Sequence, residues 1–269
     1  MLYVYIVMSA AVMLLLNVPF KIFTSAWSWW AVPLIFIGLF VTFVILHCLV
    51  LLLAILCTDT KKPARDTDIF RFIVNGFLEI AFKLLNIKIH STGLEKIPQD
   101  ECFLLVCNHI HDLDPAIIYY QVPDARLAFI GKKDIEKEMP IVFKALHKLS
   151  GLLIDRENNR EAVKTIVNAT RLINEGKNSV AIFPEGYTSR DGQLQTMRNG
   201  AFKIATKSKS KIVVCSLVGT REILKNLFKR KTDIYFDVIE VIDTAEQGQT
   251  TEIGEKVYGL MSESIEKHK

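Results

Sequence analysis

The distribution of charge constrains this chain more than any other feature of its sequence. Residues 1–60 contain one basic side chain, Lys21, and one acidic side chain, Asp59, so the whole net charge of +4 lies after residue 60. A water-soluble domain covers its surface largely with charged and polar groups, which the first 60 residues do not have. We therefore expect an apolar N-terminal piece of residues 1–60 joined to a charged domain of residues 61–269.

Two almost continuously apolar stretches lie within the N-terminal piece, residues 2–16 and residues 33–57, the second interrupted only by Thr42 and His47. About 20 apolar residues are needed to cross the hydrocarbon core of a membrane, so these stretches predict two transmembrane helices. Trp27, Trp29 and Trp30 come just before the second stretch, where an aromatic belt at the membrane surface is expected. The alternative is a pair of helices buried inside a soluble protein.

Basic residues follow the second apolar stretch directly, at Lys61, Lys62 and Arg65. Basic residues flanking a membrane span tend to remain in the cytoplasm, so residues 61–269 are expected on the cytoplasmic face of an integral membrane protein. A cleaved signal peptide is not expected, because no basic residue precedes the first apolar stretch.

The pattern of residues 66–86 predicts an amphipathic helix. Arg71, Asn75, Glu79 and Lys83 recur every four residues, which places them on one narrow stripe of a helix surrounded by apolar side chains. Two interpretations stay open: a helix lying in the membrane interface, or a core helix with one solvated edge. The neighbouring apolar spans favour the interface.

After residue 86 the sequence alternates short apolar strands with amphipathic helices. This alternation predicts an α/β fold with a mixed, largely parallel sheet flanked by helices. The expected strands are residues 87–90, 103–107, 127–130, 152–154, 180–183, 212–217 and 234–241. The expected helices are residues 115–120, 141–149, 160–175, 200–207 and a terminal helix within 251–267.

Several common catalytic and binding motifs are absent. The sequence has no GxxxxGK[ST] or GxGxxG phosphate loop and no GxSxG nucleophile elbow. Its five cysteines include no CxxC pair, and a cytoplasmic domain keeps its thiols reduced, so we expect the cysteines to serve in packing. A modest net charge in a membrane-bound chain also speaks against binding to nucleic acid.

The densest group of reactive side chains is the segment 108–115, NHIHDLDP, at the end of an apolar strand. Ligands of α/β folds bind at such strand ends. We expect the Asp114 carboxylate to orient the His109 imidazole, which would then act as a base. Two alternatives remain: Asp114 is only the N-cap of a helix that has Pro115 in its first turn, or His109, His111 and Cys107 contribute to a metal site.

Two further segments each end an apolar strand with polar groups. They are GLLIDR at 151–156 and FPEGYTSRDG at 183–192. Together with NHxxxxDP, and in this order, they resemble the glycerolipid acyltransferase family, and most closely its 1-acyl-glycerol-3-phosphate (lysophosphatidic acid) acyltransferases. The resemblance runs from about residue 70 to 217. Weaker similarities are Lys132-Lys133 and the segment RNGAF at 198–202. Tyr187 and Thr188 stand where this family usually has Thr and Arg.

The resemblance implies acyl transfer from a thioester to an alcohol. Because a thiolate is a good leaving group, the difficult step is deprotonating the alcohol, which a histidine base accelerates by about 10²–10⁴-fold. His109 is then the base, with His111 a competing candidate, and Asp114 orients it. Glu185 accepts a hydrogen bond from the glycerol part, and Arg156 holds the acceptor phosphate together with Arg190. The remaining expected substrate-binding residues are Gly186, Thr188, Ser189 and Lys132.

The implied product is phosphatidic acid, made from lysophosphatidic acid and either acyl-CoA or an acyl carrier protein as donor. Neither a cofactor nor a metal is implied. Glycerol 3-phosphate or another lysophospholipid is an alternative acceptor, and a non-catalytic membrane adaptor or a metal hydrolase is an alternative class. Basic stretches at 203–211 and 221–231 fit anionic membrane lipids, an acidic carrier protein or a solvated face.

Overall fold

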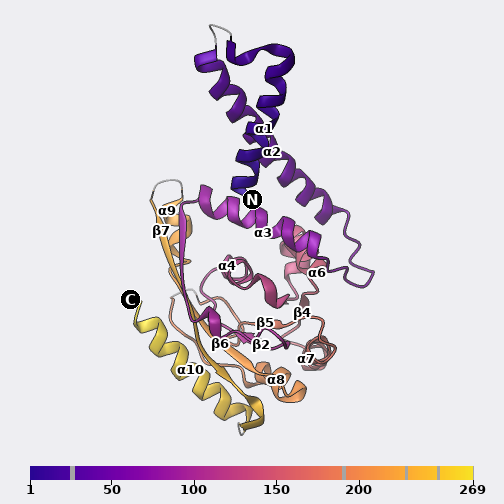
Figure 1. Ribbon diagram of the computed structural model, residues 1–269. Helices are drawn as coiled ribbons and strands as arrows, with labels where there is room; N and C mark the ends of the chain where they lie inside the picture. The colour runs from indigo at the N-terminus through magenta and orange to yellow at the C-terminus, as the bar shows by residue number, and fades with distance from the viewer. Residues whose placement is uncertain (25–27, 190–191, 228–229, 247–248, 269) are drawn as a thin grey trace.

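The computed structural model describes residues 1–24, 28–189, 192–227, 230–246 and 249–268. A pair of long helices, α1 and α2, projects from one side of an α/β domain, and helix α3 crosses beneath the pair (Figure 1). This arrangement follows the division of charge along the chain, because the projecting pair contains the weakly charged residues.

Helices α1 (Leu2–Phe20) and α2 (Ser28–Leu56) match the two apolar stretches. Both contain windows long and apolar enough to cross a membrane, Leu2–Phe20 and Trp30–Leu56, and only 11% of each window is buried within the protein. Unburied apolar side chains of this extent need an apolar surrounding such as a bilayer. Trp30 is 53% exposed on α2, whereas the expected belt residue Trp27 lies outside the described residues.

Helix α3 (Asp68–Leu84) begins after Thr67, whose side chain accepts the N–H of Phe70 at 3.3 Å and caps the helix. Its polar stripe does not form a solvated edge. Arg71, in that stripe, is only 5% exposed, whereas Phe72, on the apolar side, is 62% exposed. The helix therefore turns part of its polar stripe inward and presents apolar side chains outward, which favours the interfacial interpretation.

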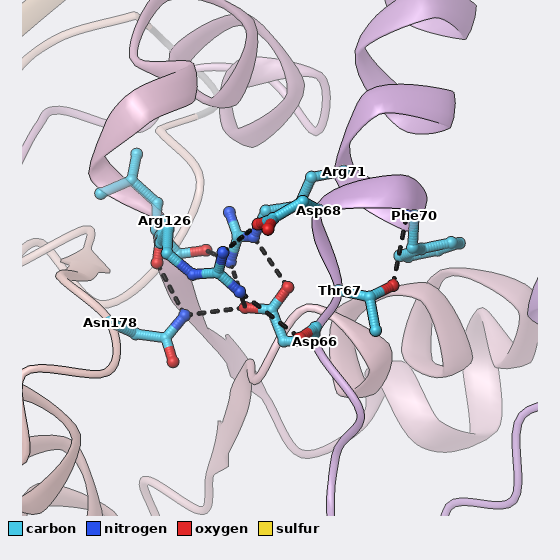
Figure 2. A network of polar contacts seen from close by, with 8 residues as sticks. Asp66, Thr67, Asp68, Phe70, Arg71, Arg126 and Asn178 are labelled. Atoms are coloured by element: carbon cyan, nitrogen blue, oxygen red, sulfur yellow. Dashed lines mark hydrogen bonds and ion pairs between the residues drawn. The ribbon is translucent and has the colours of Figure 1, made fainter.

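A buried ion pair explains why Arg71 faces inward (Figure 2). Its guanidinium donates to both carboxylate oxygens of Asp66, at 2.8 and 2.6 Å, and Asn178 donates to the same carboxylate at 2.9 Å. Arg126 pairs with Asp66 and with Asp68. Burial acts to raise the pKa of Asp66, but these hydrogen bonds and positive charges outweigh it and lower the pKa. The network fixes the start of α3 to the sheet.

The sheet is mixed and largely parallel, as predicted. Its seven strands lie in the order β1-β7-β6-β2-β5-β3-β4, and β6 and β7 form the one antiparallel pair recorded among the described strands. The strands are β1 (Ile87–Thr92), β2 (Leu104–Val106), β3 (Ala128–Lys132), β4 (Leu152–Ile154), β5 (Val180–Ile182), β6 (Ile212–Val218) and β7 (Thr232–Ile242).

Helices cover both faces of the sheet. The central strands are therefore buried on both sides, which is why their sequences are continuous runs of apolar residues. The side chains of β2 alternate between two cores: Leu105 packs with α4, and Leu104 packs with α8 and α10. The helices are α4 (Asp114–Gln121), α5 (Ile135–Glu138), α6 (Pro140–Lys148), α7 (Asn159–Asn174), α8 (Lys203–Ser208), α9 (Glu222–Asn226) and α10 (Thr250–Glu266). Short 3₁₀ turns occur at Ile22–Thr24, Leu94–Lys96, Pro123–Ala125, Asn199–Phe202 and Thr244–Glu246.

The chain leaves the adjacent strands β2 and β5 in opposite directions. From β2 it crosses by α4 to β3 on one side, and from β5 it crosses by α8 to β6 on the other side. Such a switch opens a crevice at the carboxyl ends of the two strands, where α/β proteins bind ligands. The segments 108–115 and 183–192 both begin at this crevice.

Candidate active site

The loop after β2 brings His109 and Asp114 into contact. His109 Nδ1 lies 2.9 Å from Asp114 Oδ2. A carboxylate only accepts, so Nδ1 carries the proton and Nε2 carries the free lone pair. The geometry is that of a histidine base whose tautomer is fixed by a carboxylate.

The His109 ring is held on a second side by Phe183, the first residue after β5. The two rings stack with centroids 4.1 Å apart and an interplanar angle of 16°. The His109 side chain is 16% exposed, whereas Asp114 is fully buried. The imidazole of His109 is therefore partly accessible, whereas the Asp114 carboxylate that holds it is closed to solvent.

The structure corrects the expected role of Asp114 in the helix. Helix α4 starts at Asp114 itself, its N-cap is Leu113, and no side chain caps it. The Asp114 carboxylate turns back instead and accepts the N–H groups of Ile110 and His111, at 2.7 and 2.8 Å. One carboxylate thus closes the loop and orients the base.

Glu185 occupies a different position from the one expected of a glycerol ligand. Its Oε1 accepts the backbone N–H of His109 at 2.7 Å, and its Oε2 accepts the N–H of Gln195 at 2.8 Å. The residue is 1% exposed, and burial raises its pKa despite those hydrogen bonds. Both oxygens of Glu185 are thus engaged and closed to solvent, and the carboxylate holds the backbone of His109 in place.

The turn after Pro184 packs tightly against the same loop. Gly186 has φ 86°, and a Cβ at this position would collide with the side chain of Arg198, so only glycine fits. Ser189 donates its N–H to the carbonyl of His109 at 2.8 Å and its hydroxyl to the carbonyl of Gln193 at 2.7 Å. Ser189 is therefore a structural residue of the turn, whereas Thr188 stays partly accessible.

Two arginines from different elements interact electrostatically here, and one of them, Arg198, contacts the turn. Arg156 follows β4, and burial and then the positive charge of Arg198 lower its pKa. The side chain of Arg198 extends over Gly186, and the backbone N–H of Arg198 donates to the carbonyl of Pro184 at 2.8 Å. Two guanidinium groups near each other stabilise a bound anion, because it relieves their mutual repulsion.

Arg198 was not among the residues assigned from sequence, although the RNGAF segment resembled the family. The expected partner of Arg156, Arg190, lies outside the described residues. Lys132, at the end of β3, forms an ion pair with Glu138 at 2.6 Å, which raises its pKa; the charge of Asp112 has the same effect. Lys132 is thus electrostatically coupled to the loop of the base.

Asn108 is a second residue whose role was not evident from the sequence motifs. Its side-chain amide donates to the carbonyl of Leu217 at 2.9 Å and accepts the N–H of Leu217 at 2.7 Å. The residue is 2% exposed. Asn108 therefore replaces two ladder hydrogen bonds between β2 and β6, where β2 has ended, and sets the point at which the loop of His109 departs.

The other histidine of the loop has a local role. His111 Nδ1 accepts the N–H of Leu113 at 3.2 Å. Within the part of the chain that the structure describes, histidine, cysteine, aspartate and glutamate side chains nowhere gather in a group of three that would hold a metal ion.

Fold and site together define an α/β domain with a carboxylate-supported histidine base at its switch point. A family model described as Acyltransferase matches residues 88–218. A 1-acyl-sn-glycerol-3-phosphate acyltransferase of Borreliella burgdorferi is 30% identical over 173 residues, 64% of this chain and 68% of that protein. A protein of the same description from Haemophilus influenzae is 34% identical, covering 45% of this chain and 52% of that protein.

The chloroplastic 1-acyl-sn-glycerol-3-phosphate acyltransferase LPAT1 of Arabidopsis thaliana is 33% identical over 51% of this chain, and the match covers 38% of that protein. The fold is that of the solved 1-acyl-sn-glycerophosphate acyltransferase PlsC from Thermotoga maritima, with a TM-score of 0.62 at 23% identity over 81% of this chain and 95% of that one. The chain belongs to the 1-acyl-sn-glycerol-3-phosphate acyltransferase family and is an acyltransferase.

Proposed function

We propose that this chain transfers an acyl group from a thioester to the free hydroxyl of 1-acyl-glycerol 3-phosphate, giving phosphatidic acid. The observation that carries the proposal is the His109–Asp114 pair: the 2.9 Å contact at Nδ1 leaves Nε2 free to act as a base, and the His109 side chain is 16% exposed. The relatives act on this acceptor according to their names, which supports the same substrate here.

His109 acts as the general base. Its Nε2 takes the proton from the acceptor hydroxyl while the oxygen attacks the thioester carbonyl. The tetrahedral intermediate then collapses, the C–S bond breaks, and the imidazolium returns its proton to the departing thiolate. Asp114 holds the ring in the reactive tautomer and stabilises the imidazolium at 2.9 Å. This sequence balances without an enzyme nucleophile.

Arg156 and Arg198 hold the acceptor phosphate. Guanidinium groups bind phosphate oxygens through charge-assisted, often bidentate, hydrogen bonds. Because Gly186 has no side chain, the Arg198 side chain can extend across the turn at this position. Thr188 contributes a partly accessible hydroxyl to the same turn, and Arg190 remains a candidate third ligand.

The N-terminal residues 1–60 anchor the enzyme in the membrane through α1 and α2, and residues 61–269 form the catalytic domain on the cytoplasmic face. The basic residues Lys61, Lys62 and Arg65 directly after α2 support this orientation. The exposed apolar side of α3 supports a position of this helix in the interface. The acyl donor is acyl-CoA or an acyl carrier protein, with no cofactor.

The test is acyl transfer from oleoyl-CoA, and separately from oleoyl-acyl carrier protein, to 1-oleoyl-glycerol 3-phosphate in membranes that contain the expressed chain. We expect phosphatidic acid with at least one donor and its loss in His109→Ala. The matched control is His268→Ala, which removes a histidine paired with Asp237 elsewhere on the sheet. Transfer to glycerol 3-phosphate or lysophosphatidylcholine in place of 1-oleoyl-glycerol 3-phosphate would refute the assigned acceptor, and normal turnover by His109→Ala would refute the assigned base.

A further inference from the structure

A pocket lies where the chain leaves helix α2, and none of the candidate active-site residues lines it. It has a volume of about 250 Å³ and is formed by the loop that follows α2 and by the end of α6. In Figure 1 this loop passes beside α6. Its charged and titratable lining side chains are Asp59, Lys62, Arg65, His147 and Lys148.

Positive charge dominates the pocket. Lys62 and Asp59 pair at 3.5 Å, but their side chains are 72% and 48% exposed, so solvent weakens this pair. No ion pair recorded among the described residues includes Arg65 or Lys148. The Lys148 ammonium rests 5.0 Å from the centre of the Phe70 ring. Two cations thus face the pocket without an anionic partner.

The pocket is held in shape by contacts that do not involve these two cations. Lys144 of α6 donates to the carbonyl of Leu56, the last residue of α2, at 2.7 Å. His147 Nε2 lies 3.0 Å from the carbonyl of Lys62, to which it donates. A ligand would therefore find the walls already in place, and binding would cost little ordering.

The location of the pocket indicates the chemistry of its ligand. It begins at Cys57, immediately after the candidate span Trp30–Leu56, and the last apolar side chains of α2, Leu53 and Leu56, are 50% and 46% exposed. If α2 spans the bilayer, the pocket lies at the depth of the phospholipid head groups. Unpaired basic side chains at that depth attract anionic lipids.

We propose that this pocket binds the phosphate of an anionic phospholipid head group, through Arg65 and Lys148, at a site separate from the catalytic crevice. Arg65 donates in the planar, two-pronged manner that suits phosphate oxygens, and Lys148 adds a second charge. The site ties the catalytic domain to the membrane surface at the foot of α2. It differs from a diffuse basic patch because both of its proposed ligands line one cavity.

The experiment measures binding of dioleoyl-phosphatidylglycerol to the purified full-length protein in phosphatidylcholine nanodiscs. This lipid is a phosphodiester, unlike the phosphomonoester acceptor assigned to the catalytic site. We expect wild type to prefer it over phosphatidylcholine, and Arg65→Gln with Lys148→Gln to bind about 25-fold more weakly, about fivefold for each cation. Lys61→Gln is the matched control, because it removes a neighbouring exposed charge that does not line the pocket.

Equal binding of the two lipids by wild type would overturn the proposal, whatever the variants do. An equal loss in Lys61→Gln would show general attraction to the surface and would also overturn it. Inorganic phosphate is the second probe: displacement of the lipid by phosphate at equal concentration would assign the pocket to a soluble anion instead. Arg65→Lys with Lys148→Arg should keep most of the affinity, which separates charge from folding defects. None of these readouts depends on acyl transfer.

Discussion

Glu185 holds the backbone of His109, since its Oε1 accepts the backbone N–H of this residue at 2.7 Å. In return, the carbonyl of His109 accepts the N–H of Ser189, so two hydrogen bonds join the loop after β2 to the turn after β5. If His109 is the base, as proposed, the acidic residue of the FPEG segment acts on the reaction through the position of that base.

Replacing Glu185 should lower turnover without weakening acceptor binding. In Glu185→Gln the amide nitrogen replaces one acceptor oxygen and faces a backbone N–H, which costs about 1–3 kcal/mol of stability. We expect kcat to fall about tenfold and the KM for acceptor to stay within twofold, measured with a thermal melt of the same preparation. Glu161→Gln, on the exposed surface of α7, is the control. A raised KM for the acceptor with unchanged kcat would contradict this role and would indicate that Glu185 contacts the glycerol directly.

Removing the base or its support should act on kcat. His109→Ala is expected to lose about 10²–10⁴-fold in kcat, because proton abstraction is lost while the phosphate contacts stay. Asp114→Asn should also lower kcat, because an amide neither stabilises the imidazolium nor enforces the Nδ1–H tautomer. Steady-state kinetics with varied acceptor concentration separates an effect on kcat from an effect on KM. A large rise in KM with kcat intact in either variant would contradict these roles.

The two arginines should determine affinity for the acceptor. Arg156→Ala and Arg198→Ala each remove charge-assisted hydrogen bonds worth about 1.5–3 kcal/mol, so the KM for acceptor should rise about 10–100-fold. Arg160→Ala, in the exposed first turn of α7, should leave KM unchanged. An unchanged KM in both Arg156→Ala and Arg198→Ala would show that other groups, Arg190 among them, bind the phosphate.

The buried pair beneath α3 should contribute to stability in a pH-dependent manner. Asp66→Asn leaves Arg71 without its counterion and should cost about 3 kcal/mol at pH 7 in urea unfolding. The pKa of Asp66 is lowered by folding, so this contribution is present above about 3.9, the unfolded value, and is lost as the pH falls through the lower folded value. The difference between Asp66→Asn and wild type should therefore shrink on acidification.

The matched control for that pair is Asp68→Asn. Asp68 also pairs with an arginine, Arg126, but its side chain is 89% exposed, so its removal should cost no more than about 1 kcal/mol. An equal loss in both variants would mean that burial does not decide the strength of the network.

Much of the architecture was predictable because secondary structure follows local periodicity. The pattern located all seven strands, and both apolar helices matched their stretches. The short helices α5 and α9 were not predicted, since four or five residues carry too few turns to show a period. The inward orientation of Arg71 was also missed, because its carboxylate partner makes burial of a charge tolerable and periodicity does not reveal partners.

The sequence by itself determined the apolar N-terminus, the α/β class and the acyltransferase family, and it singled out His109 and Asp114, because each depends on local composition or on a short motif. The tertiary structure alone decided which of these polar groups are buried and which stay accessible. It buried Glu185 and Ser189 and brought the charge of Arg198 close enough to lower the pKa of Arg156, from segments far apart in the chain. The reason is physical: the accessibility of a lone pair or charge depends on its neighbours in space, and these are set by packing.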